Sequence, residues 1–118
     1  TQYFFDAGVY LGFIERVRRA GIDVEIVPGI LPVTNFSQVV KFSKMCGASV
    51  PTWMERLFDG LDNDPETRLL VVATAAAEQC RLLHDEGVDS FHFYTLNRAD
   101  LSFAICHILG IRPAEIAP

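Results

Sequence analysis

Hydrogen-bonding side chains accompany three runs of sequence that are typical of β-strands. Gln2 lies in the first run, residues 28–35 follow the second, and residues 94–98 end the third. The amide of Gln2 both donates and accepts hydrogen bonds, which suits the edge of a pterin or of a nicotinamide carboxamide. The alternative is a polar residue beside a strand that satisfies a neighbouring group.

Arg98 stands just past the third run, where its permanently charged guanidinium can bind a carboxylate through two parallel hydrogen bonds. A surface ion pair with Asp100 is the alternative. Gln38 and Phe42 lie four residues apart on a predicted helix, so they share one face, with Gln38 in the first turn. Packing in the core is the alternative for Phe42, because aromatic side chains mostly fill cores.

Several other chemistries lack the residues that they need. The histidines, His84, His92 and His107, do not have the spacing of a metal site, and we expect no metal ion. No Ser or Cys lies in a nucleophile-elbow pattern, so covalent acyl chemistry has no anchor. The glycines form neither a dinucleotide fingerprint nor a P-loop.

Composition limits the class of protein. The chain has 118 residues, 50% of them hydrophobic, which predicts one globular domain segment over residues 1–118 rather than disorder. Its formal charge is −5, with no Lys- or Arg-rich run, so nucleic acid and anionic membranes are poor partners. The apolar runs are too short to cross a bilayer, and a signal peptide is not apparent.

Cys46, Cys80 and Cys106 are far apart and form no Cys-x-x-Cys pair. We interpret them as reduced, largely buried thiols of a cytoplasmic protein.

Hydrophobic periodicity and helix-capping residues predict the order β-α-β-α-α-α-β-α. Strands are expected at residues 1–6, 22–27 and 91–96, with Pro28 and Gly29 ending the second. Helices are expected between Asp6 and Gly21, from Asn35 to Gly47, from Pro51 to Phe58, from Asp64 to Gly87, and from Ala99 to Leu109.

Strands that alternate with helices predict parallel βαβ units, and a segment of a (β/α) barrel fits this pattern best. A whole barrel needs about 200 to 250 residues, so three units leave two bare sheet edges. We therefore expect a homo-oligomer rather than a stable isolated monomer. The first strand-like run starts without a preceding cap, as if cut within a strand.

In barrel enzymes ligands bind at the C-terminal ends of the strands. We therefore expect Gln2, residues 28–35 and residues 94–98 to lie together at that end of the barrel segment.

The sequence also contains strings that resemble one family. They are residues 1–6, 23–33, 35–36, 58–62, 91–98 and 104–107. Together they are similar to the C-terminal part of the bacterial type of methylenetetrahydrofolate reductase, and the resemblance extends from Gln2 to about Pro113. Residues 28–32 and 92–98 are its most specific blocks.

The resemblance implies an α/β fold, namely the C-terminal three β/α units of a (β/α)8 TIM barrel that carries FAD. It implies that six residues bind the folate substrate or the nicotinamide donor, namely Gln2, Gln38, Phe42, Tyr94, Leu96 and Arg98. Phe42 would stack on either ligand, Leu96 would contact the aminobenzoate ring of folate, and Arg98 would lie near the glutamate carboxylates.

The implied reaction is a flavin-dependent reduction. NADH or NADPH reduces FAD, and the reduced flavin then passes a hydride to 5,10-methylenetetrahydrofolate, which becomes 5-methyltetrahydrofolate. In the family the general-acid Glu and nearly all FAD contacts come from earlier strands, so we expect no catalytic residue in this segment.

Three hypotheses follow. The first is that the chain is part of a reductase and is active only within the complete barrel. The second is a stand-alone, non-catalytic module that oligomerises through its open sheet edges and binds folate weakly at most. The third is an unrelated barrel enzyme with another substrate.

Overall fold

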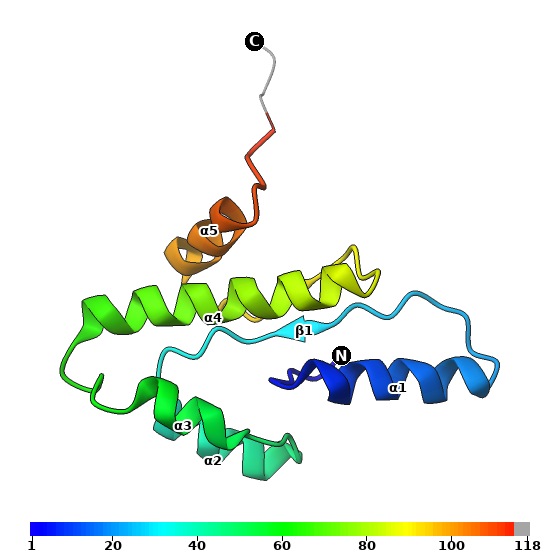
Figure 1. Cartoon of the computed structure of the whole chain (residues 1–118), viewed down its shortest axis with the longest axis horizontal. Helices are drawn as coiled ribbons and strands as arrows, with labels where there is room; N and C mark the ends of the chain where they lie inside the picture. Colours follow the sequence, from blue (N-terminus) through cyan, green and yellow to red (C-terminus); the bar gives the residue numbers. More distant parts are fainter. Residues whose placement is uncertain (115–118) are drawn as a thin grey trace.

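The computed structural model describes residues 1–114 and has a mixed α/β fold. Its elements in chain order are α1 (Ala7–Arg19), β1 (Gly29–Ile30), α2 (Phe36–Cys46), α3 (Thr52–Phe58), α4 (Pro65–Asp85), β2 (His92–Phe93) and α5 (Ala99–Ile108) (Figure 1). All five predicted helices are present within a few residues of their expected ends. The α/β class and the helix order are therefore confirmed.

The helices begin where side chains satisfy free backbone N–H groups. The Asp6 carboxylate accepts from the Gly8 N–H at 2.8 Å, and Asp64 Oδ1 accepts from the Thr67 N–H at 3.1 Å. Pro65 occupies the first turn of α4, where its missing N–H costs no hydrogen bond. Such caps act within a few residues, which is why the sequence predicts them well.

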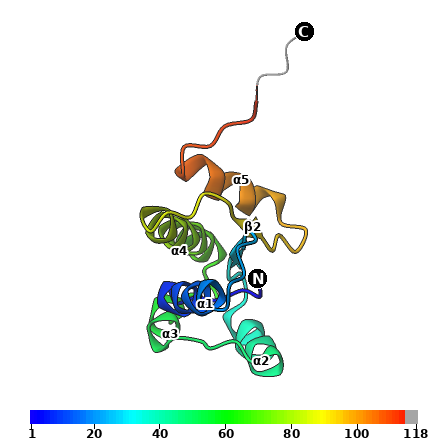
Figure 2. The same cartoon turned by 90° about the vertical axis from the view of Figure 1, so that its right-hand side faces the viewer.

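The sheet is small and parallel. Gly29 pairs with His92 and Ile30 pairs with Phe93, while Tyr3 forms a parallel bridge to Gly29 on the other side. Three chain segments thus run in the same direction, in chain order across the sheet. α1 and α4 lie together on one side of these strands, and α2 lies away from both (Figure 2).

The predicted strand at residues 22–27 is wrong. Three carbonyls of this stretch accept hydrogen bonds from side chains: Arg18 Nη1 donates to Ile22 O at 2.7 Å and to Val24 O at 2.9 Å, and the Tyr10 hydroxyl donates to Ile26 O at 2.7 Å. Val27 O accepts from the Thr1 amino group at 2.8 Å, but residues 22–27 form no strand pairing. The strand forms later, at Gly29–Ile30.

Pro28 and Gly29 therefore belong to the sheet rather than ending it. Pro28 O accepts from the His92 N–H at 3.0 Å, and Ile30 O accepts from the Tyr94 N–H at 2.9 Å. The other two expected strands are also shorter than predicted, because residues 1–6 contribute only the Tyr3 bridge and residues 91–96 only His92–Phe93.

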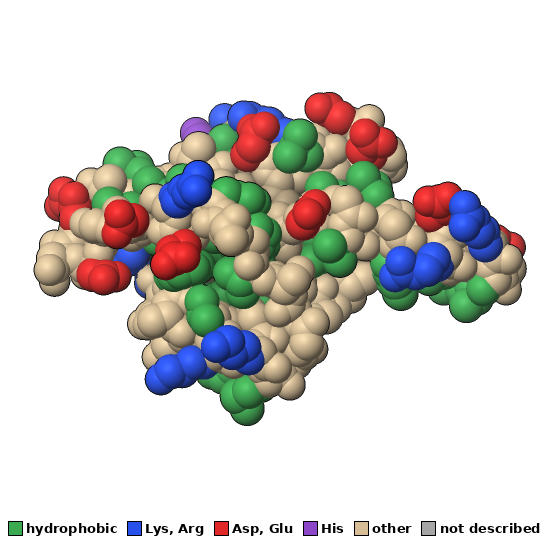
Figure 3. Space-filling view, turned by 60° about the horizontal axis from the view of Figure 1, so that its bottom comes forward, with side chains coloured by type: hydrophobic (Ala, Val, Ile, Leu, Met, Phe, Trp, Pro, Cys, Tyr) green, Lys and Arg blue, Asp and Glu red, His purple; other side chains and the backbone are tan. Residues whose placement is uncertain are grey.

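The core lies between the sheet and the helices on its covered side. Ile30, Leu83 and Ile105 are fully buried, and the Gln79 side-chain amide donates to Phe4 O at 2.7 Å, which ties α4 to the first strand segment. Many large apolar side chains stay exposed, and Figure 3 shows them lying between acidic and basic groups on one face. Within residues 1–114, none of the helices combines the length and apolarity that crossing a membrane requires.

The expectation of largely buried thiols holds for only part of the set. Cys80 is buried, and desolvation raises the pKa of its thiol to about 12. Cys106 is partly buried, whereas Cys46 is exposed in the last turn of α2.

Candidate functional site

A cavity of about 510 Å³ opens where the chain leaves β1 and β2, at the C-terminal ends of the parallel strands. We call it the strand-end cavity. It is lined by Tyr3, Leu31, Pro32, Thr34, Asn35, Gln38, Val39, Phe42, Met45, Cys46, Tyr94 and Leu96. Four of the six predicted binding residues, Gln38, Phe42, Tyr94 and Leu96, are thus brought together.

α2 positions two of these side chains. Asn35 caps the helix, with its side-chain oxygen accepting from the Gln38 N–H at 3.1 Å, and this places Gln38 in the first turn beside the cavity. Phe42 follows one turn later on the same face and is 58% exposed. Its ring is therefore not a core residue in this structure, although packing was the alternative.

Tyr94 is fixed by the sheet beneath it. Its hydroxyl donates to Thr1 O at 2.9 Å, and its ring stands edge-on to Tyr3 at a centroid distance of 6.1 Å. A Cβ on Gly29 would lie 2.5 Å from Thr1 O and 2.7 Å from Tyr94 Cε2. Only glycine allows the tyrosine to lie this close to the strands.

Leu96 lies on a tight turn after β2. Its φ angle is 48° and that of Asn97 is 63°, and these are the non-glycine residues with positive φ in residues 1–114. The left-handed conformation is unfavourable for a leucine and is found preferentially at functional sites. The turn leaves the Leu96 side chain 69% exposed at the edge of the cavity.

Gln2 and Arg98 do not line the cavity. Gln2 Oε1 accepts from the Tyr3 N–H at 3.0 Å, which is the structural role considered as its alternative. Arg98 makes two hydrogen bonds of 3.3 Å to the Asp100 carboxylate, one from Nε and one from Nη2. These bonds hold the pKa of Asp100 below its ordinary value.

The cavity lining sets what the site can do chemically. The named lining residues carry apolar, aromatic, amide, hydroxyl and thiol groups, and none of them is Asp, Glu, Lys, Arg or His. In residues 1–114, three or more metal-ligating side chains do not gather anywhere. The arrangement suits the flat face of a neutral heterocycle, with amide and hydroxyl groups available at the edges.

Residues 1–110 match the methylenetetrahydrofolate reductase family. The chain belongs to that family. It is 61% identical over 113 residues to the 5,10-methylenetetrahydrofolate reductase of Pectobacterium carotovorum and 58% identical over 113 residues to that of Escherichia coli. In both cases the match covers 96% of this chain and 38% of the relative. Methylenetetrahydrofolate reductase 1 of Schizosaccharomyces pombe is 32% identical over 119 residues, which are 20% of its length.

The resemblance found in the sequence is therefore confirmed at the level of the family of enzymes. This chain spans about two fifths of the length of the bacterial reductases that it matches.

Sequence reasoning missed three polar or flexible residues of the cavity in this reductase-family chain, namely Tyr3, Met45 and Cys46. Met45 and Cys46 follow Phe42 by three and four residues, so helical spacing alone would have added them. Asn35 was not missed, because residues 28–35 were expected to face a ligand. Tyr3 carried no local signal, because its position depends on pairing with Gly29, a residue far along the chain.

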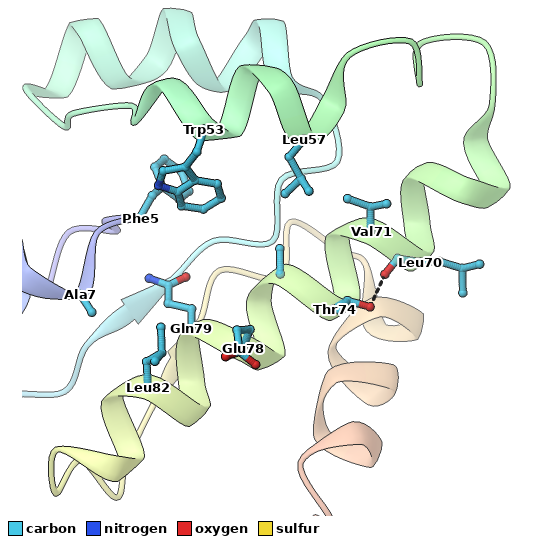
Figure 4. A pocket seen from close by; sticks show the side chains of 11 residues that line it. Phe5, Ala7, Trp53, Leu57, Leu70, Val71, Thr74, Glu78, Gln79 and Leu82 are labelled. Atoms are coloured by element: carbon cyan, nitrogen blue, oxygen red, sulfur yellow. Dashed lines mark hydrogen bonds between the residues drawn. The ribbon is translucent and has the colours of Figure 1, made fainter.

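A second cavity was not predicted at all. This outer groove of about 480 Å³ is lined by Phe5, Ala7, Trp53, Leu57, Leu70, Val71, Thr74, Ala75, Glu78, Gln79 and Leu82. Figure 4 shows Trp53 and Leu57 of α3 facing α4, with Phe5 beside Trp53. Its lining comes mainly from helices of this reductase-family chain rather than from strand ends.

Proposed function

We propose that this chain forms the C-terminal three β/α units of a (β/α)8-barrel reductase. In this proposal residues 1–118 are one segment of a flavin-dependent enzyme that reduces 5,10-methylenetetrahydrofolate to 5-methyltetrahydrofolate with NADH or NADPH. Family membership supports the reaction class, and the parallel order Tyr3, Gly29, His92 supports the barrel segment. The observation that carries the proposal is the convergence of Gln38, Phe42, Tyr94 and Leu96 on one strand-end cavity.

Each residue then has a physical role. Phe42 stacks on the pterin or the nicotinamide, and the Gln38 amide hydrogen-bonds the edge of the same ring. Leu96 contacts the aminobenzoate ring beyond it. Orienting a flat ring by one stacked face and one polar edge is what hydride transfer requires, because the donor and acceptor atoms must meet at a fixed distance.

We also propose that Gln2 and Arg98, which do not line the cavity, bind the substrate from beside it. Arg98 would exchange the Asp100 carboxylate for a glutamate carboxylate of folate, since its present hydrogen bonds are long at 3.3 Å and exposed. Gln2 would reach a substrate from the strand segment that also carries Tyr3.

The residues present fit a flavin only in part. The aromatic and apolar lining suits the face of a ring system, whereas the lining offers no cation for the diphosphate of FAD. FAD would supply the hydride chemistry when bound, and most of its contacts would come from other strands of the barrel. The part played by this chain is to hold and orient the substrates. The expected cytoplasmic location and homo-oligomeric state stay predictions.

A stand-alone module that oligomerises through open sheet edges is the alternative. The visible absorption spectrum of the gently purified protein separates the two ideas. An oxidised-flavin band supports the reductase, and a colourless, folded oligomer of this chain alone supports the module.

The site itself is tested by Phe42→Ala in the complete reductase that contains this segment. Loss of a stacking ring should raise the folate KM by about tenfold, the effect expected for one large aromatic contact. Phe103→Ala is the matched control, because Phe103 is 59% exposed on α5 and does not line the cavity. Equal KM values for the two variants would refute the assigned site.

A further inference from the structure

The helix that carries Gln38 and Phe42 is only lightly anchored to the rest of the molecule. Of the eleven residues of α2, Val39 and Ser43 are the buried ones. At the start of the helix the Phe36 ring also stacks on Phe58, with a centroid distance of 5.7 Å. The second half of α2 therefore depends on Ser43 for its position.

Ser43 is 1% exposed, and its hydroxyl lies 3.0 Å from the Tyr3 hydroxyl. The Tyr3 hydroxyl also lies 3.7 Å from Cys46 Sγ, which donates to Phe42 O at 2.9 Å. The other end of this connection is the sheet, because Tyr3 bridges to Gly29. A chain of hydrogen bonds thus joins the first strand segment to the last turns of α2.

We propose that Ser43 is a positioning residue of the substrate site and that its hydrogen bond to Tyr3 fixes the rotation of α2. Successive residues of a helix are about 100° apart, so holding Ser43 against Tyr3 turns Phe42 toward the cavity. The inference rests on the proposed function, because it concerns how Gln38 and Phe42 meet a substrate there.

The chemistry explains why a hydroxyl is needed. Burial already raises the pKa of the Tyr3 phenol, so this group stays a neutral donor that needs an acceptor. Without the Ser43 oxygen, the remaining partner is a thiol at 3.7 Å, which is a weak acceptor. A buried polar group that loses its partner favours any rearrangement that restores a hydrogen bond. Rotation of α2 away from Tyr3 is such a rearrangement, since it opens the site to water.

The test is Ser43→Ala in the complete reductase. We expect the KM for folate to rise by about three- to tenfold, the effect of one net hydrogen bond. The kcat at saturating substrate should stay within about twofold, because bound substrate selects the competent rotation of α2 and the cost of this selection appears in KM. Ser37→Ala is the matched control on the same helix: Ser37 is exposed and does not line the cavity, and its hydroxyl bonds only to the Asn35 side chain.

Tyr3→Phe completes a double-mutant cycle, since it removes the partner hydroxyl and keeps the ring. If the bond acts as proposed, the double variant has the KM of either single variant, and the two effects do not add. Additive effects, or a Ser43→Ala variant with the KM of Ser37→Ala, overturn the inference. If Ser43→Ala does not fold, Tyr3→Phe alone decides, and an unchanged folate KM in it overturns the inference. Absence of folate reduction in the unmodified reductase would instead refute the proposed function.

Discussion

The strand-end cavity and the outer groove are almost equal in size, at about 510 and 480 Å³, and both are mainly apolar. They differ in what their polar groups do. In the outer groove the Gln79 amide donates to Phe4 O and the Thr74 hydroxyl donates to Leu70 O, so both serve the chain's own backbone. In the strand-end cavity the Tyr94 hydroxyl also donates to a backbone carbonyl, that of Thr1, whereas the Gln38 side chain makes no hydrogen bond within residues 1–114.

Volume and apolarity alone therefore do not distinguish a ligand site from a groove between helices. The difference lies in the backbone that presents the side chains. The strand-end cavity gathers residues from distant parts of the sequence and leaves the Gln38 amide free to meet a ligand, whereas in the outer groove the Gln79 and Thr74 side chains already bond to backbone carbonyls.

The largest expected effect comes from Gly29→Ala, which places a new side-chain atom beneath the strand-end cavity. The new Cβ would lie 2.5 Å from Thr1 O and 2.7 Å from Tyr94 Cε2, so backbone and ring must both shift. We expect a loss of about 1 to 3 kcal/mol in the free energy of unfolding, together with a higher folate KM. Urea unfolding and steady-state kinetics of the complete reductase measure the two effects.

Gly12→Ala in α1 is the control for this prediction. The nearest atom to its new Cβ is Arg16 Nη1 at 4.0 Å, and alanine is the better helix former, so stability should rise by up to about 1 kcal/mol. A Gly29→Ala variant as stable as the wild type would show that Tyr94 is not held against the sheet.

The helices were predictable because their signals are local. Asp6, Asn35 and Asp64 each cap a helix within three residues of their own positions, and glycine or proline marks most of the ends. The second strand was not predictable in the same way. Residues 22–27 are β-branched and apolar enough for a strand, yet the side chains of Arg18 and Tyr10 donate hydrogen bonds to carbonyls of this stretch. Only pairing with His92 places the strand at Gly29.

The site residues also divide into those that local sequence patterns predict and those that depend on long-range contacts. Gln38 and Phe42 follow from helical spacing, and Tyr94 and Leu96 follow from the rule that ligands meet strand ends. The Tyr3–Ser43 bond joins residues 40 positions apart, which no local pattern reveals.

Leu96→Ala and Leu70→Ala compare the two cavities directly. Leu96 is 69% exposed at the strand-end cavity and Leu70 is 70% exposed at the outer groove, so the two substitutions remove equal side chains from similar surroundings. We expect the folate KM to rise by about three- to tenfold for Leu96→Ala, the effect of one partly buried apolar contact. Leu70→Ala should leave it unchanged. A larger effect at Leu70 would move the substrate site to the outer groove.

The smallest expected effect concerns Arg98, which lies beside the strand-end cavity without lining it. Its guanidinium is paired with Asp100, whose pKa lies below the ordinary 3.8, so both groups are charged at neutral pH. Asp100→Asn removes this competing carboxylate, and if Arg98 binds a glutamate carboxylate of folate the KM should fall by about twofold, as expected for one exposed ion pair.

Asp89→Asn provides the comparison, because Asp89 is an exposed acid that lies 3.9 Å from His84 rather than near Arg98. Both substitutions remove one negative charge, so a general electrostatic effect on an anionic substrate would lower both KM values equally. A decrease confined to Asp100→Asn assigns the effect to the released guanidinium. Equal values would leave Arg98 as a surface residue and confine the substrate site to the strand-end cavity.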